Sequence, residues 1–194
     1  MRIGITGGIG SGKSEVTRYL RSLGEYVICA DEVSKQIVKP GGEGAQALRR
    51  VFGDRIFHEN GELDRKTLAA DVFNDDERLK LLNDTLHPLI LAHIEKLAKT
   101  IEGRVFIDAA LLIQTGMHKT VDRIWLVVAD KKSRVERVMK RDGLTAQEVK
   151  RRIKSQLSDE EMKPYVDEIV DNSGSIEALQ RRVDDLLEQP KNAR

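Results

Sequence analysis

The stretch GITGGIGSGKSEV, residues 4–16, constrains the fold more than any other part of the sequence. Residues 7–14 fit the pattern G-x-x-x-x-G-K-[ST], in which a glycine-rich loop joins a strand to a helix. Both neighbours have the required patterns, because residues 2–6 are typical of a short strand and residues 13–23 have helical spacing. This part of the chain is therefore predicted to fold as strand, loop and helix.

A loop of this kind binds phosphate through its backbone. Its consecutive N–H groups, unobstructed by Cβ atoms, cradle phosphate oxygens, and the following helix adds the positive end of its dipole. Lys13 is expected to reach the β- and γ-phosphates, and the Ser14 hydroxyl to bind Mg²⁺. The alternative, a glycine-rich turn without a ligand, is disfavoured because strand, motif and helix are in register. We expect a nucleoside triphosphate to be held by eight residues: Gly8, Ile9, Gly10, Ser11, Gly12, Lys13, Ser14 and Glu15.

The rest of the sequence alternates between strand and helix patterns on either side of a helical block. Further strands are expected at 26–29, 104–108, 124–129 and 168–170, and further helices at 32–38, 131–141, 145–156 and 176–188. Alternation of this kind predicts an α/β fold whose parallel sheet is covered on both faces. Residues 43–102 instead predict consecutive helices at 45–52, 65–73 and 76–83 and a last one starting at Pro88. We therefore expect a core of residues 1–42 and 103–194, with 43–102 as an inserted helical subdomain.

Composition limits the partners and the compartment. The 33 basic and 32 acidic residues give a formal charge of +1, which disfavours a dedicated nucleic-acid binder. The single Cys29 excludes an internal disulfide and favours a reducing cytoplasm. No apolar run approaches the roughly 20 residues that span a bilayer, and no signal-like segment precedes the first strand. We expect a cytoplasmic protein with no nucleic-acid or membrane partner, as a monomer or weak homo-oligomer.

Two carboxylates follow or end predicted strands. Asp31 comes just after the strand at 26–29, and Asp108 ends the strand at 104–108. Ligands of open α/β sheets bind at this carboxyl edge, so Asp31 is a candidate to take a proton from an acceptor hydroxyl or to order the magnesium shell. A plain helix cap is the alternative for Asp31. Asp108 is predicted to belong to the magnesium site, and its alternative is an aspartate that merely ends a strand.

Three arginines share one face of the helix expected at 131–141. Arg134, Arg137 and Arg141 are spaced i, i+3 and i+7. Such a face is usually solvated, and spacing alone favours that interpretation. The alternative is a lid that closes on a transferring phosphoryl group and neutralises its charge. Spacing leaves both interpretations open.

Taken in order, the motifs resemble those of the dephospho-CoA kinase family, the last enzymes of coenzyme A biosynthesis. The resemblance covers nearly the whole chain. It is carried by TGGIGSGKS at 6–14, ADEV at 30–33, GELDRKTL at 61–68, LHP at 86–88, ALLI at 110–113, RVMKRDGLT at 137–145 with Gln156, and DNSGS at 171–175. The phosphate loop alone occurs in many nucleotide-binding proteins, whereas this ordered set is specific.

The resemblance implies a three-layer α/β/α fold like that of P-loop nucleotide kinases. It has a parallel five-stranded sheet, a helical substrate-binding insert and a lid at about 131–160. It implies ATP-dependent phosphorylation of the ribose 3′-hydroxyl of dephospho-CoA, with Mg²⁺ as cofactor. Asp31 matches the base for that hydroxyl, and Arg65 and His87 fall in the insert that holds the acceptor. Lys13, Arg137 and Arg141 become catalytic, and the loop with Asn172 holds the adenine. Without the resemblance, His87 is an ordinary histidine at a helix entry.

Several positions depart from the family's pattern. Cys29 replaces the first of two aspartates, which removes a negative charge beside the predicted site, and Ala110, Gln114 and Glu15 also differ. Two other functions remain alternatives. A P-loop kinase of another small alcohol would phosphorylate that alcohol and not dephospho-CoA. A nucleotide switch would bind without transfer, but the Asn-Lys-x-Asp signature of guanine-specific switches is absent from the sequence.

Overall fold

The computed structural model describes residues 1–73 and 75–189. They form two compact units, one of residues Met1–Val27 with those from Ile101 onward, and one of Ile28–Thr100. The second unit thus begins before the insert expected at 43–102 and includes the helix that follows the second strand. The fold of each unit is described separately.

A parallel sheet forms the centre of the first unit, as the sequence predicted. Its strands are β1 (Arg2–Thr6), β2 (Tyr26–Cys29), β3 (Val105–Asp108), β4 (Arg123–Val128) and β5 (Glu168–Asp171). Their order is β2-β3-β1-β4-β5, and β1 lies between β3 and β4 with parallel pairing to both. The carboxyl end of β1, where the glycine-rich loop begins, is therefore central in the sheet.

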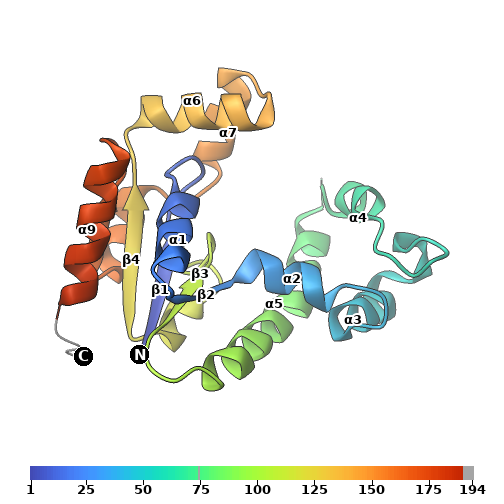
Figure 1. Ribbon diagram of the computed structural model, residues 1–194. Coiled ribbons are helices and arrows are strands. Elements are labelled where there is room, and N and C mark those ends of the chain that lie inside the picture. Colours follow the sequence, from blue (N-terminus) through green and yellow to red (C-terminus); the bar gives the residue numbers. More distant parts are fainter. Residues whose placement is uncertain (74, 190–194) are drawn as a thin grey trace. The chain divides into compact units, whose positions relative to one another are not determined.

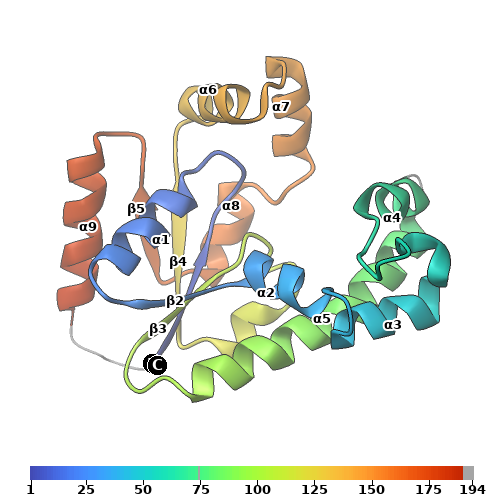
Figure 2. The same ribbon diagram turned by 45° about the vertical axis from the view of Figure 1, so that its right-hand side comes forward.

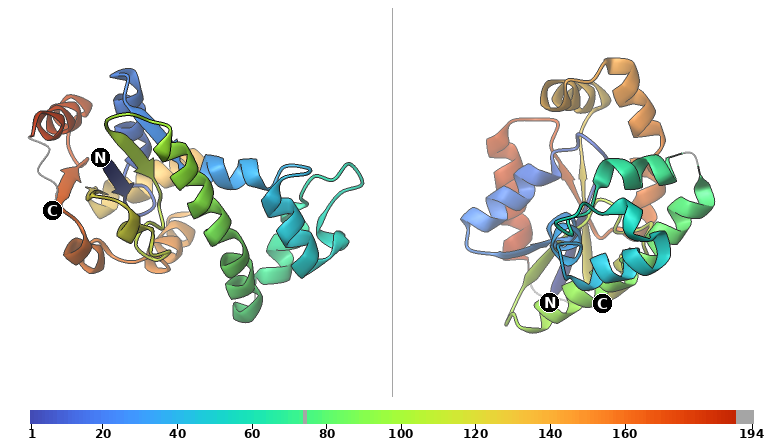
Figure 3. Two further views of the ribbon diagram at one scale, coloured as in Figure 1. Left: turned by 90° about the horizontal axis from the view of Figure 1, so that it is seen from below. Right: turned by 90° about the vertical axis from the view of Figure 1, so that its right-hand side faces the viewer.

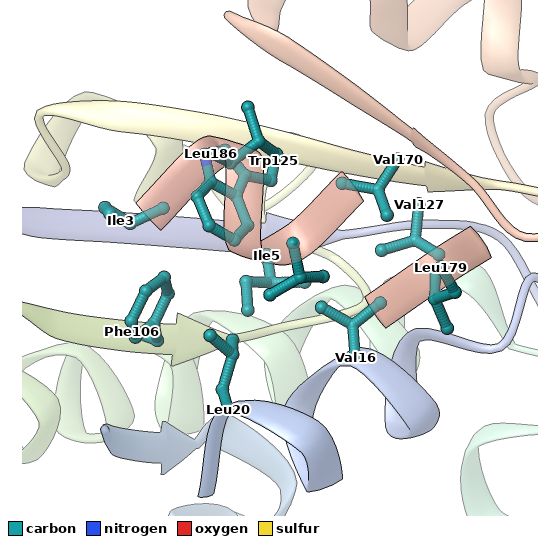
Figure 4. Packing of buried hydrophobic residues seen from close by; sticks show 11 residues of the cluster. Ile3, Ile5, Val16, Leu20, Phe106, Trp125, Val127, Val170, Leu179 and Leu186 are labelled. Carbon is teal, nitrogen blue, oxygen red and sulfur yellow. The ribbon is translucent and has the colours of Figure 1, made fainter. Parts of the chain in front are cut away.

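Alternating side chains of the strands build a core on each face of the sheet. On one face, Trp125 and Val127 of β4 pack with Val16 of α1 (Lys13–Ser22) and Leu179 of α9 (Ile176–Glu188), as Figure 4 shows. On the other face, Leu126 packs with Met162 of the short helix α8 (Asp159–Met162). Figure 1 shows α1 and α9 beside the strands. Helices on both faces give the expected three layers.

Helices α6 (Lys131–Asp142) and α7 (Ala146–Lys154) occupy the segment expected to form a lid. Asp130 caps α6 by accepting from the Ser133 amide, and hydrogen bonds from the Ser133 side chain and amide lower the pKa of its carboxyl. Gly143 ends α6 in the left-handed conformation, and Thr145 forms a capping box with Glu148 at the start of α7. Figure 2 shows both helices next to the loop between β1 and α1.

The second unit is helical. It contains α2 (Ala30–Ile37), α3 (Glu43–Phe52), α4 (Arg65–Val72) and α5 (Asp76–Lys99), with a short 3₁₀ helix at Asp54–Ile56. Helix α5 contacts α2, α3 and α4, and its course along α2 and α3 is visible in Figure 3. The first unit has further 3₁₀ turns at Met117–Thr120 and Lys163–Tyr165.

The prediction that a helix starts at Pro88 is wrong. Pro88 lies inside α5, which runs unbroken for 24 residues. A proline in a helix interior removes one backbone hydrogen bond and costs about 3 kcal/mol. Burial of Ile94 and Ala98 and contacts with three other helices offset that cost, so tertiary packing overrides the local signal. None of the described helices is long and apolar enough to span a membrane.

Candidate nucleotide-binding site

The loop between β1 and α1 is a tight turn followed by a helix start. The Ser11 amide donates to the Gly8 carbonyl at 3.1 Å, and Gly10 has a φ of +77°. Because Ile9 has no positive φ, this is a type II turn over residues 8–11. The backbone amides of Gly10, Gly12, Lys13 and Ser14 donate to no group of the described chain. The loop thus presents unpaired donors at the start of α1, as an anion site requires.

Gly12 is required at its position for two reasons. Its φ of +87° is left-handed, and a Cβ atom there would lie 1.8 Å from Nδ2 of Asn172. Asn172, which follows β5, is buried and donates from Nδ2 to the Ser11 carbonyl at 2.9 Å. The Asn172 side chain therefore supports the loop backbone directly beneath Gly12.

Lys13 and Asp108 form an ion pair at the carboxyl edge of the sheet. Lys13 is the first residue of α1 and Asp108 the last of β3, and Nζ donates to Oδ1 of the carboxylate. Asp108 is only 7% exposed, so the ammonium group neutralises a buried carboxylate. The next residue, Ser14, is exposed, whereas the Glu15 carboxylate accepts from Arg18. Asp108 thus ends β3 as the ion-pair partner of Lys13, and its place in a magnesium site stays a prediction.

The three arginines of α6 have different environments. Arg137 donates from Nη2 to the Asn172 carbonyl at 2.7 Å and from Nη1 to Ser11 and Gly10 carbonyls at 3.4 and 3.5 Å. Arg134 is 7% exposed and donates to the Ile9 carbonyl at 3.0 Å. The interpretation as a solvated face is wrong for these two residues, because both contact the loop.

Arg141 lies on the exposed part of the same helix. Its side chain is 63% exposed and forms two hydrogen bonds with Asp142, at 2.7 and 2.9 Å. The hydrogen bond from Arg141 lowers the pKa of the Asp142 carboxyl. The structure therefore brings Lys13, Asp108, Arg137 and Asn172 to the loop, while Arg141 remains paired on the surface.

The other predicted site residues belong to the helical unit. Asp31 is exposed in the first turn of α2, and its carboxylate has no partner within the described part of that unit. The N-cap of α2 is Cys29, so the interpretation of Asp31 as the helix cap is wrong. Arg65 is the exposed first residue of α4. His87 lies within α5, where burial lowers its pKa and the nearby Asp84 partly opposes that shift.

Two contacts of the loop are absent from the sequence-based site. Gln156, just beyond α7, accepts from the Ile9 amide through Oε1 at 2.8 Å. The spacing places Arg134 on a helical face but does not indicate its contact with Ile9. Neither spacing nor composition identifies these contacts, because they join residues more than 120 positions apart. The only sequence signal was the resemblance of the segment around Gln156 to a lid.

The comparisons with known proteins agree with this geometry. The family model described as dephospho-CoA kinase matches residues 1–178. A dephospho-CoA kinase of Shouchella clausii is 38% identical over 191 residues, covering 96% of this chain and 97% of that protein. A Thermus thermophilus crystal structure has a TM-score of 0.85 at 35% identity and covers 99% of this chain and 98% of its own.

A solved dephospho-CoA kinase from Campylobacter jejuni has a TM-score of 0.74 at 26% identity, covering 96% of this chain and 95% of that one. The parallel sheet and a strand–loop–helix unit with unpaired loop amides are features of the kinase-like α/β fold. On the sequence match over nearly its whole length and on this fold, the chain belongs to the dephospho-CoA kinase family.

Proposed function

We propose how the residues of this chain carry out the reaction of its family, the ATP-dependent phosphorylation of dephospho-CoA that completes coenzyme A biosynthesis. The observation that carries the proposal is the loop at residues 8–14, with unpaired amides beside Lys13. Such a loop binds the β- and γ-phosphates of ATP. The reaction transfers the γ-phosphoryl group to the ribose 3′-hydroxyl of dephospho-CoA, and ADP leaves.

Lys13 and Arg137 are the residues that we assign to the charge of the transferring group. Lys13 now donates to Asp108, and in the complex its ammonium group turns to the β- and γ-phosphates. Arg137 is held over the loop by the Asn172 carbonyl, and its planar fork of donors suits phosphate oxygens. We infer that both side chains stabilise the negative charge that develops during transfer, which is where electrostatic stabilisation is most effective.

The donors present also fit Mg²⁺. The described residues contain no cluster of three or more His, Cys, Asp or Glu side chains that could hold a metal ion. Magnesium sites in kinases need no such cluster, because substrate phosphates and water supply most of the ligands. The exposed Ser14 hydroxyl and the Asp108 carboxylate are the groups that we assign to this site. Held there, Mg²⁺ would supply positive charge to the phosphates.

Asp31 is the base that we propose for the acceptor hydroxyl. An exposed carboxylate without a partner in its own unit is free to accept a proton, and helix capping does not occupy it. We assign Arg65 and His87 to binding of the acceptor, as their match to the family pattern implies. At neutral pH the imidazole of His87 is uncharged, because burial lowers its pKa.

Arg141 is proposed to complete the site when both substrates are bound. Its guanidinium would then exchange the Asp142 carboxylate for phosphate oxygens, and its 63% exposed side chain is free to make that movement. We propose that Asn172 contributes to ATP binding by supporting the loop through its side chain.

A cytoplasmic location agrees with the single cysteine.

The test is ADP release by the purified protein with Mg²⁺ and ATP. Dephospho-CoA is compared with a panel of nucleosides at equal concentration. We expect release with dephospho-CoA, and a phosphate at the 3′-position of the product by phosphorus NMR. Turnover of a nucleoside without turnover of dephospho-CoA would refute the proposed acceptor, and ATP binding without release would refute the transfer.

A further inference from the structure

Arg134 makes contacts that the proposed reaction does not use. Its Nε donates to the Ile9 carbonyl at 3.0 Å, and its Nη1 donates to both carboxylate oxygens of Asp159 at 3.3 and 3.4 Å. A Cβ atom on Gly8 would lie 2.2 Å from Nη2 of Arg134. The guanidinium is therefore packed against the turn at residues 8–11, with its charge balanced at the start of α8.

The turn itself does not determine how its central peptide is oriented. That peptide joins Ile9 to Gly10, and rotating it by half a turn converts a type II turn into a type I turn. Glycine at the third position adopts φ of either sign at little cost, so both forms are accessible to this loop. An interaction from outside the turn must therefore stabilise one of these two turn types over the other.

Arg134 provides that interaction. A planar trans peptide points its carbonyl and its N–H in opposite directions. With the Ile9 carbonyl held by Arg134, the Gly10 amide points away from the guanidinium, and it donates to no group of the described chain. In the flipped form the Ile9 carbonyl oxygen would take the place of that amide, and would repel a phosphate. Gln156 holds the preceding peptide by accepting from the Ile9 amide. The Ile9–Gly10 peptide is therefore the one whose orientation depends on Arg134.

We propose that Arg134 is a positioning residue for ATP, which keeps the Ile9–Gly10 peptide in the orientation that presents the Gly10 amide to the phosphates. The inference rests on the proposed function, because it assumes that ATP phosphates occupy the loop. It assigns to Arg134 an effect on ATP binding that acts through the backbone, without contact to the substrate. It also explains why residue 8 is glycine although its φ is not left-handed.

The test measures binding of an unreactive ATP analogue with Mg²⁺ by calorimetry. Arg134→Met removes the donor at similar length, and Gly8→Ala displaces the guanidinium while leaving it in the chain. Each change should weaken binding about tenfold or more, the effect of losing a charge-assisted hydrogen bond. The KM for dephospho-CoA should stay within about twofold. In the variant that combines Arg134→Met with Gly8→Ala, the second change should weaken analogue binding little further, because both changes remove the same contact of Arg134 with the Ile9 carbonyl.

Asp159→Asn is the control for a purely structural role. It removes the charge that balances Arg134 but leaves the donor to Ile9, so it should lower the unfolding temperature without weakening analogue binding. Arg181→Gln, at an exposed position of α9, controls for the loss of one positive charge. Unchanged analogue binding in Arg134→Met would overturn the inference, as would additive effects with Gly8→Ala or an equal loss in Asp159→Asn. Failure of the unaltered protein to bind the analogue would instead overturn the proposed function.

Discussion

Gly12 offers the sharpest test of how the loop is supported. An alanine there would carry a Cβ atom 1.8 Å from Nδ2 of Asn172, so the buried amide must move away from the Ser11 carbonyl. Gly24, just past the other end of α1, provides the matched control. It also has a positive φ, +83°, but a Cβ atom there meets nothing within 4 Å.

The expected costs differ because only one of the two alanines displaces a neighbour. A left-handed alanine costs about 1–2 kcal/mol, and that is the whole expected cost of Gly24→Ala. Gly12→Ala adds the loss of a buried hydrogen bond, about 1–3 kcal/mol. For a chain of this length 1 kcal/mol corresponds to about 2–4 °C, so Gly12→Ala should unfold about 2–12 °C below Gly24→Ala.

Differential scanning calorimetry measures both variants, and a third measurement isolates the contact. In a background with Asn172→Ala, the added cost of Gly12→Ala should fall to that of Gly24→Ala, because no amide remains to be displaced. Equal unfolding temperatures for the two glycine variants would refute the reasoning. So would a cost of Gly12→Ala that is unchanged by removal of the Asn172 side chain.

Three further predictions concern the chemistry. Asp31→Asn should keep ATP binding but lower kcat by roughly 10²–10⁴, the usual effect of losing a general base, and a loss below about threefold in steady-state kinetics would contradict that role. Lys13→Ala should lower mainly kcat, whereas the defect of Ser14→Ala should be partly restored by a magnesium titration, and the reverse pattern would show that the roles are misassigned. Arg141→Lys should lose most of kcat despite keeping its charge, with the Kd for ATP changed far less, because lysine lacks the planar fork; full activity would place Arg141 outside the site.

The strands and the loop were predictable because their signals are local. The strand expected at 2–6 matches β1, and the one at 26–29 matches β2. The pattern at 7–14 was sufficient to place unpaired amides beside Lys13, because glycine spacing, strand and helix act within a dozen residues. Helix α5 was not predictable to the same degree, because its continuity through Pro88 depends on packing against helices from elsewhere in the chain.

The arginines of α6 show where a periodic pattern stops being informative. Spacing of i, i+3 and i+7 correctly places three side chains on one face, but says nothing about their positions along the helix axis. At 1.5 Å per residue, Arg141 lies about 10 Å further along α6 than Arg134. Arg134, in the first turn, therefore reaches the Ile9 carbonyl, while Arg141, in the last, pairs with Asp142 at the surface.

The different positions of Arg134 and Arg141 along α6 also explain how one helix can make both a fixed contact and a movable one. Arg134 is buried and also paired with Asp159, so moving its guanidinium away from the loop would disturb that ion pair as well. Arg141 is solvated, so its exchange of a carboxylate for a phosphate costs little desolvation. The start of α6 is thereby suited to hold the phosphate loop in one shape, and its end to respond to the substrate. Binding energy from the phosphates is then available for closing the exposed end rather than for ordering the loop.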